Sequence, residues 1–225
     1  MEISVEVKTR REDMLARIRG RLAGSAPGQW RAELPAVPAA LPQPALVAQF
    51  TAAVEQIGGH VYRVPGAEAS AACEQLVKIV HQCQPRRVVY ADVPALGDLV
   101  RGIARDEFEF LAVTSLVTLR DMLAQTDVGL TDADYAIAET GTLVLFQQPG
   151  RPSLLTALPA VHIAVIRAEQ IVASFADLVP AIRTRATQIS HTTLITGPSR
   201  TGDIEQVITI GAHGPRELHV VVREG

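Results

Sequence analysis

The residues best suited to chemistry follow a glycine-proline turn near the C-terminal end of the sequence. Gly197 and Pro198 end the β-branched run 192–196, which has the composition of a strand. The polar residues that follow are Ser199, Arg200, Thr201 and Asp203. Ser, Thr and Asp are common helix N-caps, so we expect a tight loop and then a short helix entered near Asp203. Backbone N–H groups, hydroxyls and a guanidinium together could hold a carboxylate or phosphate there.

A second glycine turn, Gly211-Ala212-His213-Gly214-Pro215, returns the chain a few residues later. His213 is presented from a bare backbone between two glycines, and an imidazole titrates in the range that suits proton transfer. From this stretch alone, purely structural roles for these residues are equally possible. In that alternative Ser199 and Asp203 only cap a helix, Arg200 is solvated and His213 occupies an ordinary turn.

A similar polar loop, Ala138-Glu139-Thr140-Gly141-Thr142, runs directly into the apolar strand 143–146. Loops of an open α/β sheet converge at strand ends, where ligands bind, so we expect both loops to form one site. Glu139 and His213 are the catalytic candidates, and Glu139 could act as base, as nucleophile or as partner of Arg200. The predicted ligand-binding residues are Thr140, Gly141, Thr142, Gly197, Ser199, Arg200, Thr201, Asp203, Gly211 and Gly214.

Other candidate residues favour structural roles. Asp132 and Asp134 are close enough for a metal, but Thr131-Asp132-Ala133-Asp134 is more typical of an N-cap that leads into a helical turn through Tyr135. His162 alternates with apolar neighbours, which favours a hydrogen-bonded core histidine over a site wall. No HxxxH or CxxC spacing is present, and we expect no metal site.

Composition excludes several protein classes. The chain has 225 residues, a net charge of −3, 48% hydrophobic residues and 4% aromatic residues. The charge argues against a general nucleic-acid binder, and the aliphatic content suits helices packed on a parallel sheet. GxGxxG, GxxxxGK[ST] and GxSxG are absent, which disfavours NAD, P-loop and hydrolase-elbow chemistry. No segment has the length or pattern of a membrane span or secretory signal, so we expect a cytoplasmic protein.

The two cysteines, Cys73 and Cys83, stand ten residues apart in a segment with helical periodicity. Ten residues of helix span roughly 15 Å, which is beyond disulfide reach. Two thiols are also too few for a four-thiolate iron–sulfur cluster. We therefore expect two free thiols in a reducing compartment.

The elements that must position these loops form one α/β domain, over 45–225, preceded by an N-terminal helix and a proline-rich connector over 1–44. Apolar residues at helical spacing predict a helix over 8–22, and five prolines predict an extended connector over 24–44. From residue 45 helix and strand patterns alternate, which indicates βαβ units and a parallel sheet. The sequence pattern places helices at 45–57, 68–84, 95–103, 118–125 and 174–190, and strands at 60–64, 87–90, 108–113, 143–146, 161–166 and 218–223.

Four segments resemble the LUD-domain family of lactate-utilization C proteins. They are DVGLTDADYAIAETGTLVL (127–145), LPAVHIAVI (158–166), GPSRTGDIE (197–205) and GAHGPRELHVVV (211–222), in the order and spacing of the family. Family members often have Asp where Glu139 stands and Ala where Gly202 stands. The first difference keeps the carboxylate but lengthens its reach.

This resemblance implies a Rossmann-like, mostly parallel sheet with flanking helices, similar to the sugar-phosphate isomerase and CoA-transferase superfamily. It also implies a part in L-lactate oxidation to pyruvate, beside partner subunits that hold iron–sulfur clusters, with no cofactor in this chain. We keep three hypotheses: a non-cluster subunit that binds a small anionic substrate, a stand-alone transferase or isomerase that uses Glu139, and a binding or scaffold protein without catalysis.

Overall fold

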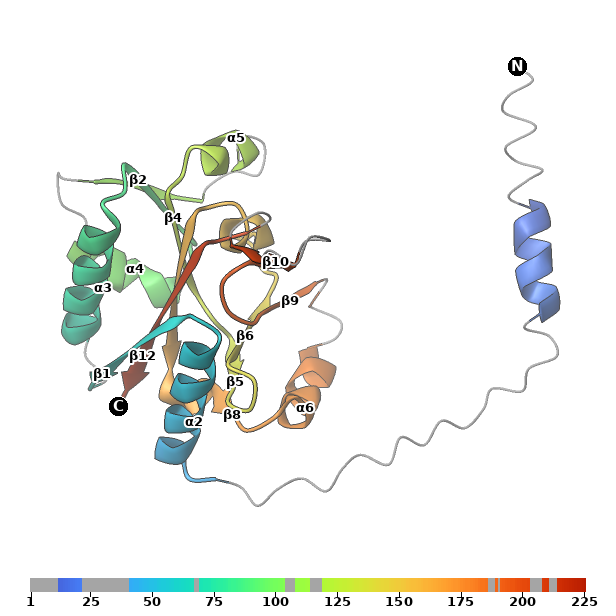
Figure 1. Cartoon of the computed structure of the whole chain (residues 1–225), viewed down its shortest axis with the longest axis horizontal. Helices are drawn as coiled ribbons and strands as arrows, with labels where there is room; N and C mark the ends of the chain where they lie inside the picture. The colour runs from blue at the N-terminus through green and yellow to red at the C-terminus, as the bar shows by residue number, and fades with distance from the viewer. Residues whose placement is uncertain are drawn as a thin grey trace. The chain divides into compact units, whose positions relative to one another are not determined.

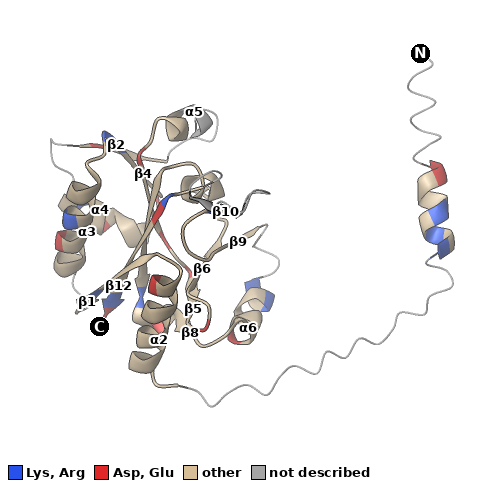
Figure 2. Ribbon diagram, viewed as in Figure 1, with Lys and Arg blue, Asp and Glu red and all other residues tan. Residues whose placement is uncertain are grey.

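The computed structural model describes residues 12–21, 41–66, 69–103, 108–113, 119–185, 189, 191–202, 208–210 and 214–225, with the backbone alone for 119–121, 201–202 and 208–210. The chain divides into two compact units, Met1–Pro38 and Ala39–Gly225. In the first unit a helix spans residues 12–21, inside the range that the sequence predicted. Acidic residues lie at its start and arginines along its second half (Figure 2), an order that complements the helix dipole.

Six parallel strands form the main sheet of the second unit, in the order β1-β12-β7-β4-β2-β3. The strands are β1 (His60–Pro65), β12 (Glu217–Glu224), β7 (Val161–Arg167), β4 (Val128–Asp132), β2 (Arg87–Tyr90) and β3 (Glu109–Ala112). The central strands are near-continuous aliphatic runs because both of their faces are buried. The last strand of the described part, β12, lies beside the first one described, β1 (Figure 1). His219 is opposite His60 in this pair.

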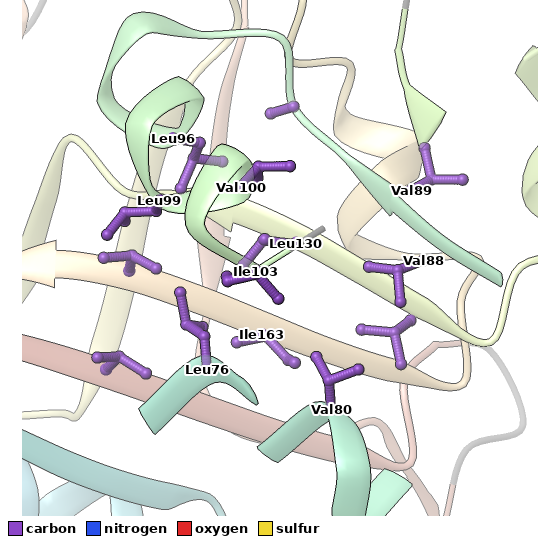
Figure 3. Close-up of a cluster of buried hydrophobic side chains, with 14 of the residues drawn as sticks. Leu76, Val80, Val88, Val89, Leu96, Leu99, Val100, Ile103, Leu130 and Ile163 are labelled. Atoms are coloured by element: carbon purple, nitrogen blue, oxygen red, sulfur yellow. The ribbon is translucent and has the colours of Figure 1, made fainter. Parts of the chain in front are cut away.

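One face of this sheet is covered by α3 (Ala69–Cys83) and α4 (Pro94–Ile103). These helices join β1 to β2 and β2 to β3, which is the βαβ succession that the sequence predicted. Leu76 and Val80 of α3 and Leu99 of α4 are almost fully buried against the strands (Figure 3). The short helix α5 (Leu119–Ala124) follows β3.

The other face is covered by α2 (Gln43–Gln56) and by a second sheet. This sheet has the order β8-β5-β6-β9. Its strands are β8 (Ile171–Val172), β5 (Tyr135–Ile137), β6 (Thr142–Phe146) and β9 (Thr192–Ile195). Phe50 and Val54 of α2 pack with Leu143 of β6 and Val220 of β12 in one cluster. On the far side of the second sheet, α6 (Phe175–Arg185) buries Leu178.

Several boundaries differ from the sequence expectation. Helix α2 begins at Gln43, inside the expected connector, because proline is tolerated in the first helical turn. The expected helical turn through Tyr135 is instead strand β5. The expected helix 174–190 ends at Arg185 as α6, and residues 186–188 and 190 lie outside the described part. The central strand β4 was not predicted. Neither were β8, β10 (Arg200–Gly202) and β11 (Ile208–Ile210), each two or three residues long.

No helix among the described residues is long and apolar enough to cross a membrane. Cys73 and Cys83 both lie on α3 as free, half-buried thiols, as the helical spacing predicted.

Candidate functional site

Antiparallel pairing of β6 with β9 brings the two predicted loops together. Leu143 lies opposite Ile195, so the chain entering β6 lies beside the chain leaving β9. The Thr142 hydroxyl lies 2.8 Å from that of Thr196 and 2.7 Å from that of Thr140. From the sequence we expected the loops to meet at strand ends of an open parallel sheet. The structure instead produces it in the second, mixed sheet.

The C-terminal end of α2 is the surface against which these loops pack. Gly141 has φ +64°, and a Cβ there would lie 2.7 Å from the backbone nitrogen of Val54. Gly197 has φ +80°, and a Cβ there would lie 3.0 Å from the Ile57 side chain. Both positions therefore require glycine for two reasons, the left-handed backbone and the close approach.

Arg200 reaches the same helix end. Its Nη2 donates a hydrogen bond of 2.6 Å to the carbonyl oxygen of Ile57, which follows the last residue of α2. A cation at a helix C-terminus is favourable because the terminal carbonyls carry partial negative charge. Arg200 is exposed, so its remaining donors face water or a ligand. It lies at the start of β10, which is a strand and not the loop that we expected.

The third predicted segment, the turn that holds Gly214, lies against Ser199. The Ser199 backbone nitrogen donates to the Pro215 carbonyl at 2.8 Å. A Cβ on Gly214 would lie 3.0 Å from the Ser199 Cβ. Gly214 and Pro215 lead into β12, and the α2 end leads into β1. The gathered loops thus lie at the amino ends of these two strands of the main sheet, whereas ligands of open α/β sheets usually bind at the carboxyl ends.

Glu139 is exposed in the turn between β5 and β6. Its backbone nitrogen donates to the Ala173 carbonyl at 3.0 Å, which ties the turn to the end of β8. Among the described residues no ion pair joins Glu139 to Arg200, so the role of partner to Arg200 is not realised in this structure. The roles of base and nucleophile stay predictions.

Three predicted site residues, Asp203, Gly211 and His213, lie outside the described residues, and the side chain of Thr201 does as well. The helix that we expected near Asp203 falls on residues 203–207, which are also outside. On either side of that segment, β10 and β11 pair antiparallel, with Gly202 opposite Ile208.

The carboxylates of Asp132 and Asp134, which were weighed as metal ligands, bind a guanidinium. Arg151 Nη1 donates to Asp132 Oδ1 at 2.6 Å, and Nη2 donates to Asp134 Oδ2 and, at 2.6 Å, to the Phe146 carbonyl. The Arg151 side chain is only 1% exposed. Asp134 Oδ2 also accepts a hydrogen bond from the Phe146 backbone nitrogen at 2.8 Å. This buried ion-pair cluster joins the end of β4 to the start of β5 and the end of β6.

His162 is a core histidine, as its alternation with apolar residues predicted. It is fully buried, and its Nε2 lies 2.9 Å from the Thr131 hydroxyl. Desolvation by burial lowers the pKa of His162 to about 4, so its imidazole is neutral at neutral pH.

The end of α2, from Val54 to Gly59, is the part of this site that the sequence reasoning missed. Gly58 and Gly59 were interpreted only as the stop of a helix. The available signal was the pair of adjacent glycines. In the structure Gly58 has φ +85°, and a Cβ there would lie 2.7 Å from Arg200 Nη2. No spacing rule connects that turn to Arg200, because the contact is purely tertiary.

Comparison with known proteins places these loops within a shared sequence pattern. The LUD-domain family model matches residues 47–222, which include the candidate site and most of the second unit. A protein of Deinococcus radiodurans named lactate utilization protein C is 33% identical over 215 residues, covering 93% of each chain. A protein of the same name from Halalkalibacterium halodurans is 32% identical over 153 residues, covering 65% of this chain and 66% of that protein.

Proteins named lactate utilization protein B match over a smaller part of their length. The one from Anoxybacillus flavithermus is 32% identical over 120 residues, which are 51% of this chain and 24% of that protein. Among solved structures, a crystal structure of a DUF162 family protein from Deinococcus radiodurans has a TM-score of 0.61 and 24% identity. It covers 81% of this chain and 99% of that chain, so the two folds are similar.

Proposed function

Because this chain belongs to the LUD-domain family, we propose that it works in lactate utilization, as the non-cluster subunit of a cytoplasmic iron–sulfur system that oxidises L-lactate to pyruvate. The relatives named lactate utilization protein C support the pathway, and those named protein B support a system of several subunits. The oxidation removes two electrons and two protons from lactate. Since this chain has only two cysteines, it cannot supply the four thiolates of a cluster, so the electrons pass to clusters on partner subunits.

In this proposal the chain binds the small anionic substrate at Arg200, whose charge offsets the negative end of α2. The observation that carries it is the gathering of Gly141, Gly197 and Arg200 around that end, beside the Ser199–Gly214 contact. The donors of Arg200 that do not bond to Ile57 would clamp the carboxylate, which a guanidinium binds strongly. Glu139 or His213 would move the proton.

A stand-alone transferase or isomerase is the second candidate function. It is favoured by the exposure of Glu139 on a turn without an ion pair among the described residues. In that case Glu139 acts as nucleophile or base on a CoA ester or a sugar phosphate, and no redox partner is needed. A scaffold role without catalysis would require neither Glu139 nor His213.

The deciding experiment is affinity purification of the tagged full chain from its source cells grown on L-lactate, followed by iron analysis and an assay of lactate-dependent dye reduction. Co-purified iron proteins with activity support the subunit proposal. An iron-free chain without partners contradicts it and favours the transferase, which is then tested with CoA esters and sugar phosphates.

The same assembly separates a catalytic subunit from a scaffold. His213→Gln and Glu139→Gln should each leave partner binding intact, and at least one of them should abolish turnover. If both variants assemble and turn over lactate at the original rate, the chain contributes no proton transfer. That result would support the scaffold role without catalysis.

A further inference from the structure

A second group of chemically capable side chains lies at the amino end of β12, on the face of the main sheet that α3 covers. Cys83 is the last residue of α3, and Glu217 and His219 alternate along β12, so both point to the same face of the sheet. One potential ligand atom from each of the three residues lies within 4.8 Å of the others. His219 Nε2 and Glu217 Oε2 are 3.2 Å apart. The function proposed above uses none of these residues.

The His219 ring is held in one orientation by residues of the neighbouring strand. Its Nδ1 lies 3.2 Å from the Tyr62 hydroxyl, and its ring stacks on that of His60 with centroids 4.9 Å apart. The side chain of His219 is only 6% exposed. When an outer partner engages one ring nitrogen in this way, the other nitrogen is oriented as a metal ligand. Here Nε2 is that nitrogen, and it is directed at Glu217.

The three groups match the ligand preferences of one kind of metal ion. A thiolate, an imidazole and a carboxylate suit Zn²⁺, whereas Mg²⁺ and Ca²⁺ prefer oxygen ligands alone. From these contacts we propose that Cys83, Glu217 and His219 bind a zinc ion. The side chain of Glu217 is 55% exposed, so the site faces solvent on one side. Three protein ligands with a solvent-facing fourth position are typical of zinc sites that bind water or a small ligand.

A zinc site would explain why a cysteine, a glutamate and a histidine come together here. A buried histidine needs only one hydrogen-bond acceptor to be satisfied, and Glu217 alone would provide it. Cys83 adds a soft ligand from a different element, at the end of a helix whose other cysteine, Cys73, hydrogen bonds to the Leu99 carbonyl instead. Sequence patterns gave no sign of the site because Cys83 lies far from Glu217 in the chain, and only the docking of α3 on β12 brings them together.

Zinc binding by the purified full chain tests the proposal. After zinc loading and dialysis, the wild-type protein should retain one zinc per chain. Cobalt loading should give a thiolate-to-cobalt charge-transfer band in the near ultraviolet. Cys83→Ser should abolish that band and weaken zinc binding by more than about 100-fold, since a ligand matters at least as much as an outer-shell partner. Tyr62→Phe, which removes only the outer partner of His219, should weaken binding by about 10- to 100-fold.

One control and one further ligand variant complete the test. Cys73→Ser removes a thiol from the same helix outside the trio and should bind zinc and cobalt as the wild type does. Glu217→Gln changes an exposed side chain without disturbing the core, so its weaker binding cannot be attributed to unfolding. Wild-type zinc affinity in both Cys83→Ser and Glu217→Gln would overturn the proposal, as would zinc below one tenth of an equivalent in the loaded wild type.

Discussion

The hydroxyl oxygens of Thr142 and Thr196 lie 2.8 Å apart, one at the start of β6 and the other just past the end of β9. This contact joins the turn that carries Glu139 to the segment that carries Ser199 and Arg200. Thr142 is buried and Thr196 is exposed, so the hydrogen bond lies at the border between the second sheet and solvent. The candidate site is therefore built on paired strands, which hold its loops more rigidly than free loops would be held.

Arg200 is expected to control anion affinity. In calorimetric titration of the full chain with L-lactate or pyruvate, Arg200→Ala should weaken binding by about 1.5 to 3 kcal/mol, roughly 10- to 150-fold, because a hydrogen bond to a charged group is lost. The matched control is Arg183→Ala, which removes an exposed arginine of α6 and should not change affinity. Equal affinity of the wild type and Arg200→Ala, with both proteins folded, would remove Arg200 from the site.

Gly141 should tolerate no side chain. Gly141→Ala places a Cβ 2.7 Å from the Val54 backbone nitrogen at φ +64°. Backbone strain and overpacking each cost about 1 to 3 kcal/mol, so the free energy of unfolding should fall by roughly 2 to 6 kcal/mol. Gly97→Ala is the control, because its Cβ would meet only the Arg101 side chain at 3.6 Å inside helix α4. In urea denaturation, the free energy of unfolding of Gly97→Ala should equal or exceed that of the wild type.

Arg151 should be essential for stability. Arg151→Met leaves the carboxylates of Asp132 and Asp134 without their buried cation, which should lower the free energy of unfolding by about 3 to 5 kcal/mol. The exposed pair Arg101–Asp98 is the comparison, because its side chains are both 76% exposed. Arg101→Met should change stability by less than about 1 kcal/mol. Equal effects of the two substitutions in denaturant titrations would contradict the structural importance of the buried cluster.

His162 should make the fold sensitive to mild acid. Its folded-state pKa of about 4 lies below the ordinary value of 6.5, so between these values the unfolded chain binds more protons. His162 therefore leaves the free energy of unfolding at its full value above pH 6.5. As the pH drops toward 4, the free energy of unfolding falls by up to about 3 kcal/mol. The buried Nδ1 has no hydrogen-bond partner among the described residues, so an added proton there would lack an acceptor.

Denaturant titrations from pH 7.5 to 4 measure this dependence. His162→Gln should flatten the fall in stability across that range, whatever its effect at neutral pH. His191→Gln, which removes an exposed imidazole, should keep the wild-type slope. An unchanged slope in His162→Gln would assign the acid sensitivity to other groups.

The sequence predicted local structure well where the hydrophobic period was long and bounded by glycine or proline. Helix α3 and the strands β1, β2, β7 and β12 lie within one or two residues of their expected ranges. Short strands were missed, because two or three residues such as β8 carry no measurable period. Asp132 and Asp134 were misinterpreted as a helix start, because N-cap chemistry is local and the partner, Arg151, is recognised only in three dimensions.

By itself the sequence determined the parallel α/β class, the free thiols of α3, the buried His162 and the identity of the two loops that meet. It could do so because aliphatic periodicity, helical rise and glycine turns act over a few residues. Only the tertiary structure decided where the loops meet, that Arg200 rests on the end of α2, and that Cys83, Glu217 and His219 come together. Those relationships depend on strand order and on the docking of helices, which follow from burial summed over the whole domain and leave no signature in any one segment.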